Sequence, residues 1–268
     1  MTPAIVTLTT DFGLTDAYVG ALKGVLLSIR SDLKVVDITH LVPPQDIRRG
    51  SEVLADSVRF YPPGSVHLAV IDPGVGSDRR ILAINAAGQY LVGPDNGLFT
   101  PFLLAPATLV HHVTNDSLFL HPVSPTFHGR DIMAPVAARL AGGLDLSLVG
   151  KRVPREDCRL LQREACSRVG GTIFGRIAGR DHFGNLRTTI TEKELADLPG
   201  SGELTFVAGK LRIEGLSSAY ADKQAGELIA LVDSQGFVEI AVVDGDAAAV
   251  TGIGAGGEIT ATRRRRWA

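Results

Sequence analysis

Two kinds of apolar pattern alternate along the first part of the chain. Residues 4–10 (AIVTLTT), 33–40 (LKVVDITH) and 65–72 (SVHLAVID) are runs rich in β-branched residues, which are typical of strands. Between them, residues 16–30 and 47–61 repeat apolar positions at helical spacing. This order requires parallel neighbouring strands with helices on the faces of the sheet. The sequence therefore predicts an α/β fold, an open sandwich around a mostly parallel sheet.

Polar residues mark the starts of the two helices. Thr15 or Asp16 is a candidate N-cap of the first helix, and Asp46 of the second, because their side-chain oxygens can accept from free backbone N–H groups. Three further elements continue the pattern: predicted strands over 79–87 and 89–93, and a predicted helix over 131–143.

The character of the sequence changes at about residue 151. Residues 151–164 are charged and have no clean period, which suits a linker between domains. Residues 165–268 contain short strand-like runs punctuated by glycine and no long helical period. We therefore predict an α/β domain over residues 1–150, a linker, and a smaller C-terminal all-β, barrel-like domain.

Composition argues against several classes of function. The 268 residues carry a formal net charge of −2, which gives no electrostatic reason to expect nucleic acid or a membrane surface as a partner. No apolar run approaches the roughly 18 residues that span a bilayer. The N-terminus lacks the basic segment of a signal peptide, so we expect a cytoplasmic protein. Cys158 and Cys166 are expected to be free thiols, and Arg263–Arg266 a solvated strand end or tail.

The stretch VIDPGVGSDRR (70–80) places an acid, a glycine turn and two arginines in succession. It is not a phosphate loop, because the third glycine of a dinucleotide loop and the lysine of a P-loop are missing, and a strand follows instead of a helix. Asp72 stands where its strand ends, and Arg79 or Arg80 can return to hold it ionised and oriented. The residues alone leave both arginines open, and a purely structural salt bridge remains the alternative.

Two other motifs place reactive side chains in loops beside the predicted sheet. Asp11, in TTDFG, follows the first strand at the edge where open α/β sheets bind ligands. A carboxylate can accept both hydrogens of a vicinal diol, although a helix cap or turn is an equal alternative. His128, in PTFHGRDIMAP, stands before a predicted helix and is a candidate proton acceptor or a structural histidine.

The β domain contributes a second set of candidates. DHFGNL contains Asp181, Phe183 and Asn185; an asparagine can read a purine edge, and Phe183 or Tyr220 can stack on a base. Ser234, in DSQGFVEIA, offers a hydroxyl. The alternative is that both motifs are ordinary hairpin turns. No zinc, calcium or GxSxG motif is present, so we expect neither a metal site nor a serine hydrolase.

Taken together and in this order, the motifs TTDFG, DAYVGALKG, DITH, VIDPGVGS, PDNG, FHGRD and DHFGN resemble one family, the S-adenosyl-L-methionine (SAM) hydrolases, or SAM hydroxide adenosyltransferases. The family is related to the fluorinating and chlorinating SAM enzymes, and the resemblance runs from Thr9 to about Ala241. It implies a SAM-binding and catalytic α/β domain followed by a β-barrel, assembled as a homotrimer. SAM then binds between the N-terminal domain of one subunit and the C-terminal domain of its neighbour, without a metal or organic cofactor.

The resemblance also implies roles for single residues. They are Asp72, Arg79 and His128 for catalysis, Asp11 for the ribose diol, Asp181 and Ser234 for the methionine part, and Phe183, Asn185 and Tyr220 around adenine. Halogenating relatives replace the residues that match Asp72 and His128, and this chain retains both. The implied reaction is hydrolysis of SAM to adenosine and L-methionine, with Asp72 and His128 holding a water and taking its proton. The alternatives are a chlorinase-like halogenase and a non-catalytic SAM or adenosine sensor.

Overall fold

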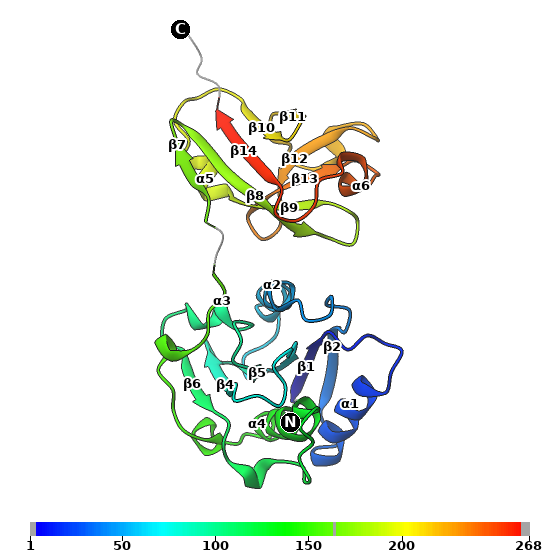
Figure 1. Cartoon of the computed structure of the whole chain (residues 1–268), viewed down its shortest axis with the longest axis vertical. Helices are drawn as coiled ribbons and strands as arrows, with labels where there is room; N and C mark the ends of the chain where they lie inside the picture. Colours follow the sequence, from blue (N-terminus) through cyan, green and yellow to red (C-terminus); the bar gives the residue numbers. More distant parts are fainter. Residues whose placement is uncertain (1–3, 163–164, 264–268) are drawn as a thin grey trace. The chain divides into compact units, whose positions relative to one another are not determined.

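The computed structural model describes residues 4–162 and 165–263, and the chain divides into two compact units, residues 1–161 and 162–268 (Figure 1). Each unit has its own core and is described by itself. The elements of the N-terminal unit are β1 (Ile5–Thr10), α1 (Tyr18–Ile29), β2 (Lys34–Thr39), α2 (Ile47–Val58), β3 (Val66–Val70), β4 (Ile81–Ala86), β5 (Gln89–Pro94), α3 (Thr100–Leu103), β6 (Leu109–His112), η1 (Asp116–Leu118), the π-helical turn η2 (Gly129–Met133), α4 (Ala134–Ala141), η3 (Leu146–Val149) and η4 (Arg155–Asp157).

The N-terminal sheet has the strand order β2-β1-β3-β5-β4-β6. The β1–β2, β1–β3 and β3–β5 pairs are parallel, whereas β4 runs antiparallel to both β5 and β6. The α/β prediction is confirmed, but the sheet is mixed. The cause is local: Ala87 and Gly88 both have positive φ, at 52° and 82°. A two-residue turn of this kind folds β4 and β5 into a hairpin, which is antiparallel by necessity.

Helices cover both faces of this sheet. Val66, Leu68 and Val70 of β3 belong to the core that α1 and α4 complete, while Ala69 and the following Ile71 belong to the core that α2 and α3 complete. Every residue of β3 is buried, because successive side chains enter opposite cores. Asp72, the first polar residue after β3, therefore lies at the carboxyl edge of the sheet.

Of the two predicted helix starts, the one at α2 is confirmed and the one at α1 is wrong. Asp46 caps α2, since its side chain accepts the N–H of Arg49 at 2.9 Å. The predicted cap of α1 at Thr15 or Asp16 is wrong, because the N-cap is Ala17, whose side chain makes no capping bond. The loop after β1 is instead held by backbone contact with the loop after β2.

The C-terminal unit is an antiparallel barrel-like sheet of strand order β11-β10-β14-β8-β9-β13-β12, with β7 paired to β8. The end strands β11 and β12 also contact each other, which nearly closes the barrel and confirms the predicted all-β architecture. Its elements are β7 (Ser167–Val169), β8 (Thr172–Arg180), β9 (Leu186–Thr191), α5 (Glu192–Ala196), β10 (Leu204–Ala208), β11 (Leu211–Glu214), η5 (Tyr220–Asp222), β12 (Leu228–Val232), β13 (Phe237–Val242), α6 (Ala247–Thr251) and β14 (Glu258–Arg263).

The segment after α4 is tied to the N-terminal unit up to the unit boundary. The N–H of Val153 donates to the carbonyl of Val110, and the N–H of Arg159 donates to Asp95 Oδ1 at 2.8 Å. Cys158 in this segment is buried, and burial raises the pKa of its thiol to about 11.

Neither Cys158 nor Cys166 forms a disulfide. In the predicted arginine run, Arg263 ends β14, and Arg264–Arg266 lie outside the described residues. No helix within residues 4–162 and 165–263 is long and apolar enough to cross a membrane.

Candidate active site

Asp72 and Arg79 form a buried ion pair just beyond the carboxyl end of β3. Arg79 Nε donates to both carboxylate oxygens of Asp72, at 2.8 and 2.9 Å, and Arg79 Nη2 donates to Oδ2 as well. Each side chain is only 5% exposed. Arg80 instead pairs with Asp95, because consecutive residues entering β4 point to opposite sides. The structure thus places Arg79, and not Arg80, against Asp72.

Gly76 allows the turn between these two residues to approach a second loop. Its φ is +80°, and a Cβ built on it would lie 2.6 Å from the carbonyl oxygen of Pro125. Gly74, in the same turn, has an ordinary φ, and a Cβ there would meet nothing closer than Ser77 Oγ at 3.4 Å. Only the second glycine is therefore required for contact between the turn and the loop that leads to His128.

His128 lies at the N-terminal end of η2, where the helix continues into α4. Arg79 Nη2 lies 3.0 Å from His128 Nδ1. A guanidinium can only donate, so Nδ1 must accept and the imidazole hydrogen must be on Nε2. Burial lowers the pKa of His128, and the positive charge of Arg79 lowers it further, against smaller opposing effects of Asp72 and Asp131. The residue is therefore held as a neutral imidazole that donates from Nε2.

Asp131 anchors the loop that carries His128, and sequence reasoning missed it. It is fully buried, pairs with Arg130 and accepts the backbone N–H of Ser124 at 2.8 Å. Burial raises the pKa of Asp131, but the bonds from Arg130 and Ser124 outweigh burial and leave the pKa below its usual value. The Arg130 guanidinium also lies over the Phe127 ring. An acid inside an otherwise apolar helical run is the signal that identifies such an anchor.

Asp11 follows β1 and is held by the loop after β2. Its Oδ2 accepts the backbone N–H of Gln45 at 2.8 Å, and Gln45 adopts a φ of +66°, which is strained for a residue with a side chain. Thr10 Oγ1 accepts the N–H of Phe12 and lies 2.9 Å from Nδ1 of the buried His40. The Gln45 bond thus fixes the position of Asp11 through Oδ2, and Oδ1 is the oxygen that does not take part in this bond.

These residues surround a pocket of about 280 Å³ in the N-terminal unit. The pocket brings together three predicted site residues, Asp11, Asp72 and His128. Its other lining residues are Phe12, Gln45, Val70, Pro73, Val75, Thr126, Phe127 and Gly129. Two carboxylates and an imidazole donor on walls of mixed polar and apolar residues can bind hydroxyl groups and orient a small nucleophile.

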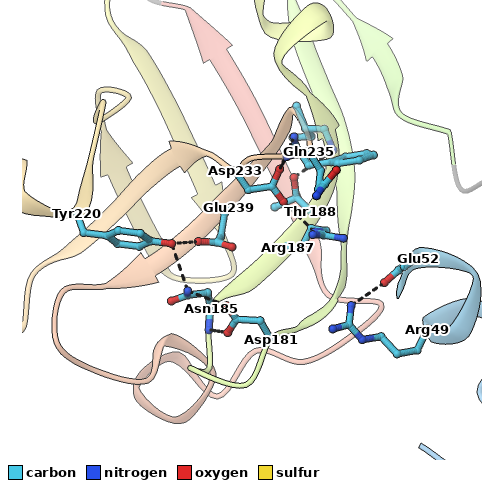
Figure 2. Close-up of polar contacts among 12 residues, drawn as sticks. Arg49, Glu52, Asp181, Asn185, Arg187, Thr188, Tyr220, Asp233, Gln235 and Glu239 are labelled. Atoms are coloured by element: carbon cyan, nitrogen blue, oxygen red, sulfur yellow. Dashed lines mark hydrogen bonds and ion pairs between the residues drawn. The ribbon is translucent and has the colours of Figure 1, made fainter. Parts of the chain in front are cut away.

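Three of the C-terminal candidates, Asp181, Asn185 and Tyr220, form a hydrogen-bonded cluster (Figure 2). Asp181 Oδ1 accepts the N–H groups of Phe183 at 2.9 Å and Asn185 at 2.8 Å, which shapes the turn between β8 and β9. Asn185 Nδ2 donates to Asp181 Oδ2 at 3.0 Å and lies 3.4 Å from Tyr220 Oη. Phe183 is 74% exposed. The structure therefore joins three of the predicted residues directly and leaves the Phe183 ring largely uncovered in this chain.

Ser234 lies in the turn between β12 and β13, beside Asp233. Asp233 Oδ1 accepts two backbone N–H groups of this turn, and Arg187 Nε donates to its Oδ2 at 2.9 Å. Glu239, which sequence reasoning missed, accepts the Tyr220 hydroxyl at 2.6 Å. Over the described parts of the chain, no group of three or more His, Cys, Asp or Glu residues could hold a metal ion.

Comparisons with known proteins agree with this architecture. The SAM hydroxide adenosyltransferase N-terminal domain matches residues 6–150, and the corresponding C-terminal domain matches residues 175–260. A crystal structure of an uncharacterized conserved protein from Thermotoga maritima superposes with a TM-score of 0.88 at 36% identity, covering 97% of this chain and 100% of that one.

Named relatives fall into two groups. An (R)-S-adenosyl-L-methionine hydrolase from Salinispora tropica is 40% identical over 96% of this chain and 97% of its own length. One from Methanocaldococcus jannaschii is 35% identical over 88% and 87%. A fluorinase from Nocardia brasiliensis is more distant, at 29% identity over 88% and 89%. With both of its domains matched and hydrolases of this identity spanning most of its length, the chain belongs to the SAM hydroxide adenosyltransferase family.

Proposed function

We propose that this protein hydrolyses SAM to adenosine and L-methionine by attack of a water on the 5′ carbon. The observation that carries the proposal is the hydrogen-bonded set of Asp72, Arg79 and His128. Asp72 and His128 of this set line one pocket together with Asp11. Relatives at 35–40% identity bear the name of this activity. The name specifies the R form, so we take the epimer with R configuration at sulfur as the substrate.

The substrate roles follow the resemblance. Asp11 is proposed to accept the ribose diol, because the Gln45 bond fixes its carboxylate and leaves acceptor capacity on the other oxygen. Asp181 and Ser234 are assigned to the methionine part. Phe183, Asn185 and Tyr220 are assigned to the surroundings of adenine.

The site is suited to holding a nucleophile. His128 donates from Nε2 to the water oxygen, and Asp72 accepts a hydrogen of the same water. Asp72 Oδ1 accepts a single bond from Arg79, so one of its lone pairs is available. With Nδ1 occupied by Arg79, we assign the transferred proton to Asp72 and a holding role to His128. Positioning of this kind can remove about 7–11 kcal/mol from a barrier where alignment is good.

The reaction balances without a further reagent. A bond forms between the water oxygen and C5′ while the C5′–S bond breaks, and its electron pair goes to sulfur. The sulfonium leaves as a neutral thioether, which needs no general acid, and the water proton passes through Asp72 to solvent. We therefore propose that no resident metal or organic cofactor takes part. Treatment with EDTA is expected to leave turnover unchanged, and loss of turnover restored by a metal would contradict this.

We also propose a homotrimer in which the N-terminal domain of one subunit and the C-terminal domain of its neighbour share each SAM. Light scattering should then give about three times the 28.3 kDa chain mass. Mixing an inactive Asp72→Asn trimer with a Tyr220→Ala trimer, after subunit exchange, should restore part of the activity. A monomer that is fully active at high dilution would refute the shared site.

The decisive experiment incubates the protein with each SAM epimer in ¹⁸O-labelled water and chloride. Adenosine carrying ¹⁸O at the 5′ position, with equimolar methionine, is the expected result. 5′-Chloro-5′-deoxyadenosine would identify a halogenase instead. Retained SAM without any product would identify a binding protein.

A further inference from the structure

Glu239 is a buried acid in an otherwise apolar strand of the C-terminal unit. It lies on β13 opposite Arg187 of β9 and Leu231 of β12, and it is 6% exposed. The hydroxyl of Tyr220, a residue that is 46% exposed, donates to Glu239 Oε1 at 2.6 Å. A buried carboxylate thus accepts the hydroxyl of a partly exposed tyrosine (Figure 2).

This position is unfavourable for a carboxylate. Burial raises the pKa of Glu239, and the nearby charges of Asp181 and Asp233 raise it further, against the opposing Tyr220 bond and Arg187 charge. A neutral glutamine could accept the same hydroxyl without placing a charge in the interior. What matters at this position is therefore a buried acceptor for the Tyr220 hydroxyl, whether it is a carboxylate or an amide oxygen.

The acid sets the direction of a chain of hydrogen bonds. Because the Tyr220 hydroxyl hydrogen points to Glu239, the tyrosine oxygen can only accept from Asn185, whose Nδ2 lies 3.4 Å away. Asp181, a carboxylate, likewise can only accept from Asn185 Nδ2, at 3.0 Å. With both Nδ2 hydrogens directed to these two oxygens, the amide oxygen of Asn185 is the group left for a ligand. That oxygen can bind a donor and rejects an acceptor.

We propose that Glu239 is a specificity-determining positioning residue: through Tyr220 it orients the Asn185 amide so that its oxygen accepts the 6-amino group of a purine and disfavours a 6-oxo purine. The proposal rests on the proposed function for the identity of the ligand. Glu239 itself acts through Tyr220 and touches no reacting atom.

The test uses the full-length protein and two probes: adenosine, with a 6-amino group and an unprotonated N1, and inosine, with a 6-oxo group and a hydrogen on N1. Calorimetry gives both dissociation constants for wild type, Glu239→Leu, Glu239→Gln and Tyr220→Phe. We expect wild type to prefer adenosine, and Glu239→Leu and Tyr220→Phe each to reduce the adenosine-to-inosine preference about tenfold, the loss typical of one oriented hydrogen bond. Glu239→Gln, which keeps an acceptor for the hydroxyl, should stay within about threefold of wild type.

Glu214 provides a matched control in the same unit. It lies on β11 and accepts the Thr205 hydroxyl at 2.6 Å, so Glu214→Leu also removes a carboxylate that holds a hydroxyl. This variant should keep the wild-type preference. An equal loss in Glu214→Leu, or an unchanged preference in both Glu239→Leu and Tyr220→Phe, overturns the proposal. If Glu239→Leu does not fold, Tyr220→Phe decides the question.

Kinetics separate this inference from the proposed function. On SAM, Glu239→Leu should raise KM about tenfold and leave kcat within about twofold, because the reacting atoms are untouched. A wild-type protein that prefers adenosine but releases none from SAM would refute the proposed function alone. Normal hydrolysis with an unchanged purine preference in both test variants would refute this inference alone.

Discussion

The Arg79 guanidinium donates to Nδ1 of His128 across 3.0 Å while the same side chain holds the Asp72 carboxylate. Three side chains from two separate loops therefore form one hydrogen-bonded unit. Because arginine has no acceptor, its position dictates which imidazole nitrogen carries the hydrogen. The electrostatic character of the pocket thus depends on a residue that does not line it.

The tautomer of His128 can be observed directly. We expect ¹⁵N NMR of the free protein at neutral pH to show a protonated Nε2 and an unprotonated Nδ1, because Nδ1 accepts from Arg79. A His128→Gln variant assigns the signals among the seven histidines. Finding the hydrogen on Nδ1 would contradict both the contact and the holding role given to His128.

The contact between Arg79 and His128 also predicts how turnover changes with pH. Burial and the charge of Arg79 lower the pKa of His128 below 6.5, so the neutral form persists to a lower pH than in an unfolded chain. Turnover should fall as pH decreases through this lowered pKa, when Nδ1 is forced to protonate against Arg79. An NMR titration should give a midpoint below 6.5 that rises in Arg79→Met. A midpoint that stays fixed in Arg79→Met would show that the charge has no influence.

Replacing Asp72 by asparagine should abolish most of the activity. The amide cannot take a proton from water, and its NH₂ group opposes the donors of Arg79, so adenosine release should fall by about 10²–10⁴. The matched control is Asp95→Asn, which disrupts the neighbouring Arg80 pair outside the pocket lining. The folded control should retain near-normal turnover. A fast Asp72→Asn enzyme would remove Asp72 from the mechanism.

The two glycines of the turn should behave differently. Gly76→Ala forces a side chain to within 2.6 Å of the Pro125 carbonyl at a positive φ, so the turn and the loop before His128 must separate. Turnover should drop by about tenfold or more, as expected for misplacement of about 1 Å. Gly74→Ala meets no such contact and should be near wild type. Equal effects of the two changes would show that the close approach is unimportant.

Asp131→Asn should destabilise the N-terminal unit, because it removes the carboxylate that pairs with Arg130; about 1–2 kcal/mol is expected, since the Arg130 side chain is 34% exposed and water can solvate its charge. The pKa of Asp131 is lowered in the folded state, so its contribution is present above pH 3.8 and is lost as pH falls through the folded pKa. Urea unfolding of wild type and Asp131→Asn should show a difference in the free energy of unfolding near pH 7, and this difference should become smaller in acid. A pH-independent difference would exclude the charge as its source.

Local patterns predicted most of the elements and part of the site. Asp72 could be placed at the sheet edge because the β3 segment is apolar apart from His67, and Asp72 is the polar residue that follows it. The choice between Arg79 and Arg80 depends on how the chain re-enters β4, which residue types do not specify. The antiparallel direction of β4 depends on a short Ala87–Gly88 turn that lacks the usual asparagine or aspartate.

Other features depend on contacts between distant segments. The requirement for glycine at position 76 arises from Pro125, a residue of another loop. Glu239 in FVEIAV has the pattern of an outward-facing acid on a strand, and only the folded C-terminal unit shows that it is buried against Tyr220. The sequence predicts a helix that begins at Asp131, but this residue lies inside a π-helical turn and anchors the preceding loop.

The shared guanidinium also bears on how such a site can evolve. Since Arg79 joins Asp72 to His128, losing any one of the three leaves the other two misdirected, and further losses should cost little more. If these three residues were replaced one at a time, most of the activity would be lost with the first replacement. Relatives with a different nucleophile are therefore expected to differ at Asp72 and His128 together, and not at one of them alone.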